Sequence, residues 1–153
     1  MNQSLRDALR FHPFFASLDT DALQLVEPLA TVRTFAAGTR VARAGDPASS
    51  FLLVTSGRAG IELHTSGREP TIVSTVHAGE VIGWSWFVEP HRWHFDVVAL
   101  DELEVLVIDA AGLRAECARS AELGRHVATR LVRVVASRLE STRHQLVDLY
   151  GHG

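Results

Sequence analysis

The 153-residue chain contains a single cysteine, Cys117, and this scarcity excludes several kinds of site. One thiol forms no internal disulfide and no metal site built from cysteines alone. Cys117 lies in a predicted helix beside Glu116 and Arg119. We expect a buried, unreactive thiol there rather than a redox sensor.

Long apolar runs and basic runs are also missing. No stretch approaches the length of a membrane-spanning helix, and the first fifteen residues hold no apolar signal core. We therefore expect a cytoplasmic protein without membrane contact. The formal net charge is -3, and the 15 lysines and arginines form no continuous basic run. This pattern argues against a surface dedicated to nucleic acids.

Motifs for catalysis or metal binding are not found. No Ser-His-Asp arrangement is readable, and there is no glycine-rich loop ending in Gly-Lys-Ser or Gly-Lys-Thr. His91 and His94, with His77 and Glu80, suggest a cupin-like metal site, but the cupin His-x-His spacing is absent, and a spacing of three turns two strand residues to opposite faces. We expect no bound metal and no enzymatic activity, with a cupin-type metalloenzyme as the least favoured alternative.

Hydrophobic periodicity divides residues 1–153, which we interpret as a single domain, into three parts. Residues 1–30 predict two N-terminal helices, one over 2–9 that is broken at His12-Pro13, and one that starts after Ser17 and ends at Pro28. Residues 31–108 predict about eight short strands separated by turns, which is typical of a sandwich or barrel. Residues 109–150 predict a short helix capped by Asp109 and a long helix from Ala121 to about Tyr150.

The long helix carries an apolar stripe of Val127, Leu131, Val135, Leu139 and Leu146. Thirty helical residues span roughly 45 Å, which is more than a small β core covers. We therefore predict that the stripe is the seam of a homodimer. Arginines 125, 130, 133, 138 and 143 form a basic rim that we interpret as a solvated face, and without a recognition helix we expect no direct DNA binding.

An ordered set of glycines and turns resembles the cyclic-nucleotide-binding domain family. Gly38 precedes the second strand, a Gly45-Asp46 turn follows it, and a strand led by Phe51 closes at Gly57. The resemblance covers about residues 10–145 and is greatest to the sensor half of the catabolite-activator (Crp/Fnr) type. It implies a mainly β fold, an eight-stranded β-roll (a jelly-roll-like double-stranded β-helix) with N-terminal helices and a long C-terminal helix. It also implies a non-enzymatic ligand-sensing or regulatory domain in signal transduction.

The resemblance places the family's phosphate-binding cassette in a stretch that holds all three tryptophans, Trp84, Trp86 and Trp93. Gly79-Glu80 stands where the cassette begins, and the family's glutamate bonds a ribose hydroxyl. The implied ligand is cyclic AMP or cyclic GMP, with no other cofactor. The implied ligand-binding residues are Gly79, Glu80, Val81, Trp84, Ser85, Arg92, Trp93 and His94.

The cassette departs from the family at its arginine. That position falls on Trp93, and Arg92 lies one residue early, which turns a strand side chain to the other face unless one residue loops out. An indole has one donor and no charge, so it does not replace a guanidinium. Three interpretations stay open. In the first, the tryptophans fill the pocket and leave a structural or interaction protein. In the second, the pocket takes a flatter ligand stacked on tryptophan beside Glu80 and His94. In the third, a cyclic nucleotide binds weakly through Arg92, His94 and amide groups of the cassette.

Overall fold

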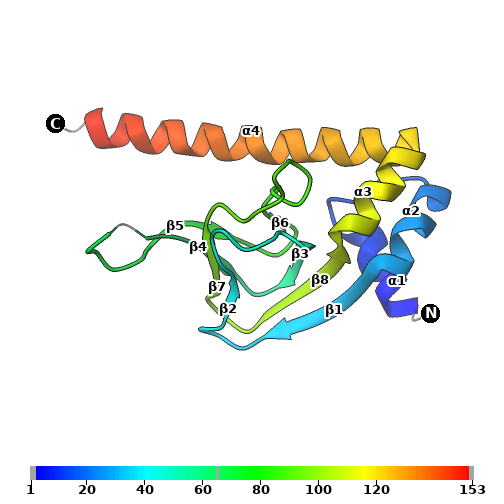
Figure 1. The fold of residues 1–153 in the computed structure, drawn as a ribbon, viewed down its shortest axis with the longest axis horizontal. Helices are drawn as coiled ribbons and strands as arrows, with labels where there is room; N and C mark the ends of the chain where they lie inside the picture. The colour runs from blue at the N-terminus through cyan, green and yellow to red at the C-terminus, as the bar shows by residue number, and fades with distance from the viewer. Residues whose placement is uncertain (1–2, 65, 152–153) are drawn as a thin grey trace.

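The computed structural model describes residues 3–64 and 66–151 and consists of a β-roll flanked by helices (Figure 1). At one end lie α1 (Gln3–Phe11), α2 (Thr20–Val26), the short 3-10 helix η1 (Glu27–Leu29) and α3 (Ala110–Arg119). The long helix α4 (Ala121–Gly151) runs across the roll. None of the helices in these two ranges is long and apolar enough to cross a membrane.

Eight strands form two antiparallel four-stranded sheets, as the alternating pattern predicts. One sheet has the order β1-β8-β3-β6 and the other β2-β7-β4-β5. The strands are β1 (Ala30–Phe35), β2 (Arg40–Ala42), β3 (Ser50–Ser56), β4 (Ala59–Leu63), β5 (Thr71–Val76), β6 (Val81–Ile82), β7 (Asp96–Ala99) and β8 (Leu103–Asp109). The predicted mainly β roll with flanking helices is confirmed.

Side-chain caps start two of the helices where the sequence predicts them. The Asp19 carboxylate accepts a hydrogen bond from the amide of Asp21 at 3.0 Å, and Asp109 accepts one from the amide of Gly112 at 2.8 Å. Such caps satisfy amides that have no partner inside the helix. Helix α1 ends at Phe11, two residues later than predicted, because a proline restricts mainly the residue just before it.

The core fills the space between the two sheets and below the helices. Phe51 of β3 is fully buried, and Trp86 stacks on it with ring centroids 4.5 Å apart. Trp93 is also buried, with 8% of its surface exposed. Cys117 is half-buried in α3, and burial together with the nearby charge of Glu116 raises the pKa of its thiol to about 11. The reactive thiolate is therefore scarce at neutral pH.

Candidate functional site

A cavity of about 250 Å³ lies between the β-roll and α4. On the roll side it is bounded by the turn that joins β5 to β6 and by the segment after α1, and on the other side by one face of α4. The lining residues are Pro13, Phe14, Gly79, Glu80, Val81, Arg130, Arg133, Val134, Ser137 and Arg138. One wall of the cavity is therefore formed by the β5–β6 turn and the segment after α1, and the other wall is formed by α4.

The turn Gly79–Val81 is fastened to β3 by backbone hydrogen bonds. The Gly79 amide donates to the Val54 carbonyl at 2.9 Å, and the Val54 amide donates to the Glu80 carbonyl at 2.9 Å. The Glu80 carboxylate accepts from the His77 amide at 2.7 Å. Gly79 has φ +88°, a left-handed conformation that favours glycine. This turn is a rigid wall for the cavity.

His12 holds the second part of the roll-side wall in place. Its ring is buried, and burial lowers the pKa of the imidazole. The Phe14 amide donates to Nδ1 at 3.1 Å, so the neutral ring carries its proton on Nε2, which lies 3.1 Å from the Val54 carbonyl oxygen. This neutral imidazole therefore ties the Pro13–Phe14 segment to the same strand that anchors the turn.

Three arginines of α4 and one acidic residue, Glu80, line this cavity. Arg138 donates to the Val81 carbonyl at 3.0 Å; burial lowers the pKa of its guanidinium, and the charge of Glu80 partly offsets that effect. Arg130 donates to the Ala16 carbonyl at 3.3 Å. Arg133 is exposed at the edge of the cavity. The excess of positive charge suits an anionic group, which arginine binds with paired hydrogen bonds.

The eight residues predicted to bind a ligand do not surround one cavity. Gly79, Glu80 and Val81 line the cavity under α4. Trp84 lines a separate apolar groove, and its ring lies 5.4 Å from that of the exposed His94. The remaining three residues, Ser85, Arg92 and Trp93, line neither space.

Arg92 does not enter the roll, so a looped-out residue does not restore the family's arginine. Its guanidinium is exposed and donates to the Gly45 carbonyl at 2.8 Å. The Trp93 amide donates to the Asp46 carbonyl at 2.9 Å, and the Gly45 amide donates to the Trp93 carbonyl at 2.8 Å. These two bonds pin the backbone so that Trp93 points inward and Arg92 outward. A cyclic nucleotide held by Arg92 inside the roll is therefore inconsistent with this structure.

The arginines of α4 were not predicted to line a site, because their pattern was interpreted as a solvated face. Arg130, Val134 and Arg138 are spaced by four residues, so they share one helix face. The apolar Val134 between two arginines on one face was the available signal that this face of α4 packs on the rest of the domain. The sequence does not show what this face packs on, because Arg138 bonds the Val81 carbonyl, which lies 57 residues earlier in the chain.

Ser85 is 2% exposed, and its hydroxyl has no hydrogen-bond partner in the described part of the chain. A buried hydroxyl without a partner costs roughly 1–3 kcal/mol. We expect Ser85→Ala to leave the free energy of unfolding unchanged or to raise it by about 1 kcal/mol, as measured by urea denaturation.

Ser120→Ala is the control. The Ser120 hydroxyl accepts a hydrogen bond from the Leu123 amide at 3.2 Å, so we expect its removal to lower the free energy of unfolding by about 1 kcal/mol. A comparable loss for both variants would contradict this description of Ser85.

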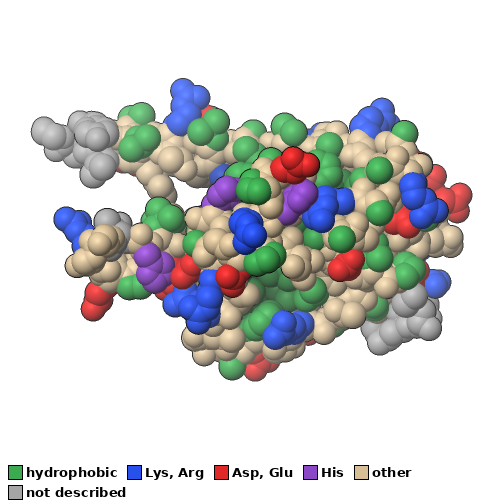
Figure 2. Space-filling model, in the orientation of Figure 1, with side chains coloured by type: hydrophobic (Ala, Val, Ile, Leu, Met, Phe, Trp, Pro, Cys, Tyr) green, Lys and Arg blue, Asp and Glu red, His purple; other side chains and the backbone are tan. Residues whose placement is uncertain are grey.

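An apolar groove of about 460 Å³ runs along another face of α4. It is lined by Trp84, Phe87, Val88, Ala128, Leu131, Val132, Val135, Ala136 and Leu139. Beyond the groove, the C-terminal part of α4 stands clear of the hairpin formed by β4 and β5 (Figures 1 and 2).

The predicted seam needs a correction, because two of its five residues face inward. Val127 is fully buried and Leu131 is 4% exposed, since the first half of α4 packs on its own roll. Val135, Leu139 and Leu146 are exposed as predicted. Val132 and Val147, which were not predicted, extend this exposed apolar face. An exposed apolar stripe of this length is typical of an interface.

Comparisons with known proteins assign the family. The family model of the cyclic nucleotide-binding domain matches residues 32–120, more than half of the chain. The chain therefore belongs to the cyclic nucleotide-binding domain family, whose members are ligand-binding regulatory domains.

Solved structures agree with this fold. A protein of Geobacter metallireducens described as a cyclic nucleotide-binding protein matches with TM-score 0.78 and 23% identity, over 88% of this chain and 97% of that chain. The N-terminal domain of a transcriptional regulator from Streptomyces coelicolor matches with TM-score 0.65 and 28% identity, over 92% and 95%. The catabolite activator protein of Thermus thermophilus matches with TM-score 0.70 and 22% identity, over 90% and 63%.

One curated relative belongs to a much longer protein. Glutaminase 2 of Bradyrhizobium diazoefficiens is 35% identical over 66 residues, which make up 43% of this chain and 11% of that protein. The match is too short to assign any activity of the whole enzyme to this chain.

Proposed function

We propose that this chain is a regulatory domain that binds a small anionic ligand between the Gly79–Val81 turn and α4. The observation that carries the proposal is the cavity itself, because the roll supplies one wall and α4 the other. Membership of the family makes cyclic AMP and cyclic GMP the first ligands to test, since each carries one anionic phosphate.

The ligand acts by holding α4 against the roll. Its anion lies between Arg133 and Arg138, while its apolar part contacts Phe14 and Val134. A ligand that contacts both walls favours the position of α4 that closes the cavity over it. Such a shift of a packed helix is one of the common ways in which a sensor domain passes on its state.

The shift of α4 is transmitted to a second copy of the chain. Crp-type domains dimerise through the helix that corresponds to α4, and here this helix exposes Val132, Leu139 and Val147. The groove beside Trp84 continues the same apolar surface. We infer a homodimer through this face, in the cytoplasm, with no catalytic role and no contact with DNA or membrane.

Arg138→Met tests the ligand cavity. Removing the guanidinium takes away a positive charge at the cavity wall, and we expect binding of cyclic AMP or cyclic GMP to weaken at least about tenfold. Calorimetric titration measures the affinity, and the shift in melting temperature with ligand reports it independently.

Arg143→Met is the matched control for this experiment. Its side chain is on the same helix but is 71% exposed, and its Nη1 lies 3.9 Å from Glu140. We expect its affinity to equal that of the wild type. Equal affinity in Arg138→Met and the wild type would place the ligand elsewhere.

A specific observation favours a second candidate function, a structural or interaction protein with a filled pocket. Trp86 is stacked on Phe51, and Trp93 is buried against Gly83, where an added Cβ would lie 3.0 Å from the indole. These side chains fill the interior of the roll. The absence of calorimetric binding and of any thermal shift with millimolar cyclic AMP or cyclic GMP would favour this candidate.

A further inference from the structure

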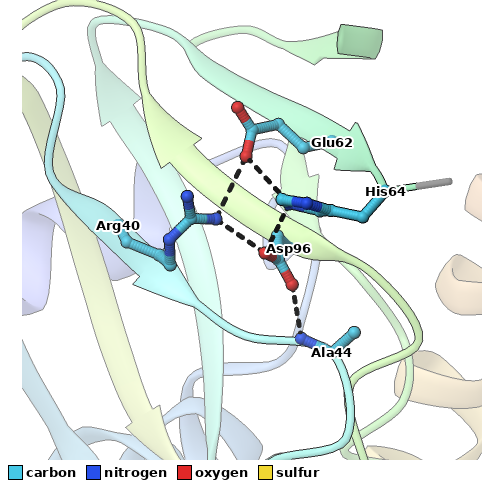
Figure 3. A network of polar contacts seen from close by, with 5 residues as sticks. All are labelled: Arg40, Ala44, Glu62, His64 and Asp96. Carbon is cyan, nitrogen blue, oxygen red and sulfur yellow. Dashed lines mark hydrogen bonds and ion pairs between the residues drawn. The ribbon is translucent and has the colours of Figure 1, made fainter. Parts of the chain in front are cut away.

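A cluster of charged side chains lies across strands β4 and β7, away from the cavity under α4 (Figure 3). Glu62 of β4 stands directly opposite Asp96 of β7 in the strand register. His64 follows one residue after the end of β4, so it shares a face with Glu62. Arg40 of β2 approaches the same group from the other side of Asp96.

The side-chain atoms of Glu62, His64 and Asp96 are arranged as metal ligands would be. One candidate ligand atom from each residue lies within 4.8 Å of the other two. His64 Nε2 is 2.9 Å from Asp96 Oδ2 and 3.6 Å from Glu62 Oε1. Zinc bonds of about 2.1 Å in a tetrahedral site place neighbouring ligand atoms roughly 3.4 Å apart, and the two distances lie on either side of that value.

Arg40 alone does not balance the negative charges of the cluster. The side chains of Glu62 and Asp96 are only 15% and 12% exposed, so their two negative charges are largely removed from water. Arg40 supplies one positive charge, with 3.0 Å to Glu62 and 2.7 Å to Asp96. Partly buried charges are costly unless they are compensated. Arg40 therefore leaves one negative charge, and a cation held beside His64 would balance it.

The surroundings favour a bound ion in two further ways. The Ala44 amide donates to Asp96 Oδ1 at 2.7 Å, which fixes that carboxylate and leaves Oδ2 for a ligand bond. This hydrogen bond, with smaller effects from His64 and Arg40, also lowers the pKa of Asp96. A hollow of about 190 Å³ opens on the cluster and is lined by His94 as well as by the three candidate ligands. It leaves room for water or a fourth ligand.

We propose that Glu62, His64 and Asp96 bind a divalent transition-metal ion of the zinc class in competition with Arg40. Imidazole and carboxylate are suitable ligands for such an ion. Arg40 Nη1 contacts the same two carboxylate oxygens that the ion needs. The Arg40 side chain is 30% exposed on the short strand β2, so it can move into solvent when an ion binds. This site is independent of the ligand cavity under α4.

The test is a calorimetric titration of the metal-free full chain with Zn²⁺, supported by the visible absorption spectrum of the Co²⁺ complex. We expect one ion per chain. His64→Gln removes one ligand and keeps both ion pairs of Arg40, and we expect it to bind at least about tenfold more weakly. Arg40→Gln removes the competing cation, and we expect it to bind at least about tenfold more tightly.

His144→Gln is the matched control, because His144 is also near a glutamate but is exposed on α4, with 3.9 Å between its Nε2 and Glu140. We expect this variant to bind Zn²⁺ as the wild type does. Three results would overturn the proposal: no saturable binding of Zn²⁺, wild-type affinity in His64→Gln, or weaker binding in Arg40→Gln. The last result would show that the four side chains form only an ion-pair network.

Discussion

Leu139→Glu is expected to dissociate the proposed homodimer into single chains. Leu139 is 58% exposed in the middle of the apolar face of α4, between Val132 and Leu146. A carboxylate buried there without a partner opposes association. We expect dimer affinity to fall at least about 100-fold, which corresponds to about 2.8 kcal/mol. Sedimentation velocity over a range of protein concentrations measures this change.

Ser141→Glu is the control for this substitution. Ser141 is exposed on α4 and lies two residues from Leu139, so it points to nearly the opposite side of the helix. The same charge there is expected to leave the dimer intact. A wild-type protein that sediments as a single chain at all concentrations would contradict the dimer.

Gly57→Ala is expected to destabilise the fold by about 3 kcal/mol or more, from the combined costs of a left-handed backbone and a steric overlap. Gly57 joins β3 to β4 and has φ +82°. A Cβ at this position would overlap the carbonyl oxygen of Glu102, a backbone atom that has no rotamer by which to move away. Denaturant unfolding measures the loss.

Gly38→Ala separates the two costs. Gly38 has a similar φ of +89°, but an added Cβ would meet no atom within 4 Å. We expect a loss of about 1 kcal/mol from the backbone conformation alone. Equal losses of unfolding free energy in the two variants would show that the close approach to Glu102 adds nothing to the destabilisation.

Local sequence patterns predicted most of the fold. The change from helical to alternating periodicity located the roll, and Asp109 caps the helix that it was expected to cap. The helix predicted to start after Ser17 is capped by Asp19. Gly38, Gly45 and Gly57 all have positive φ, which explains why the family pattern places glycine there. These features depend on a few neighbouring residues, so they are readable from the sequence.

The site depends on contacts between distant segments, and sequence patterns did not give these. Spacing alone left open whether Arg92 or Trp93 points into the roll. The answer lies in backbone bonds to Gly45 and Asp46, nearly fifty residues earlier. Likewise, periodicity defined the apolar stripe of α4 but not where the roll stops covering it, so Val127 and Leu131 were assigned to the seam.

The cluster at Glu62, His64 and Asp96 was missed for the same reason. Its members come from two strands whose register places Glu62 opposite Asp96. The sequence drew attention instead to His91 and His94, which are close in the chain. Neither His91 nor His94 belongs to the metal-ligand cluster found among residues 3–64 and 66–151.

We expect the cavity under α4 to couple ligand binding to dimerisation. Coupling between two sites is reciprocal, so a ligand that shifts α4 must change the dimer dissociation constant. The most direct measurement is that constant, determined by sedimentation with and without cyclic AMP or cyclic GMP, for the wild type and Arg138→Met. The nucleotide concentration is chosen to saturate the wild type but to leave most of Arg138→Met unliganded. We predict that the nucleotide then changes the dissociation constant of the wild type and leaves that of Arg138→Met nearly unchanged. An unchanged constant in the wild type, or the same change in both proteins, would contradict the account.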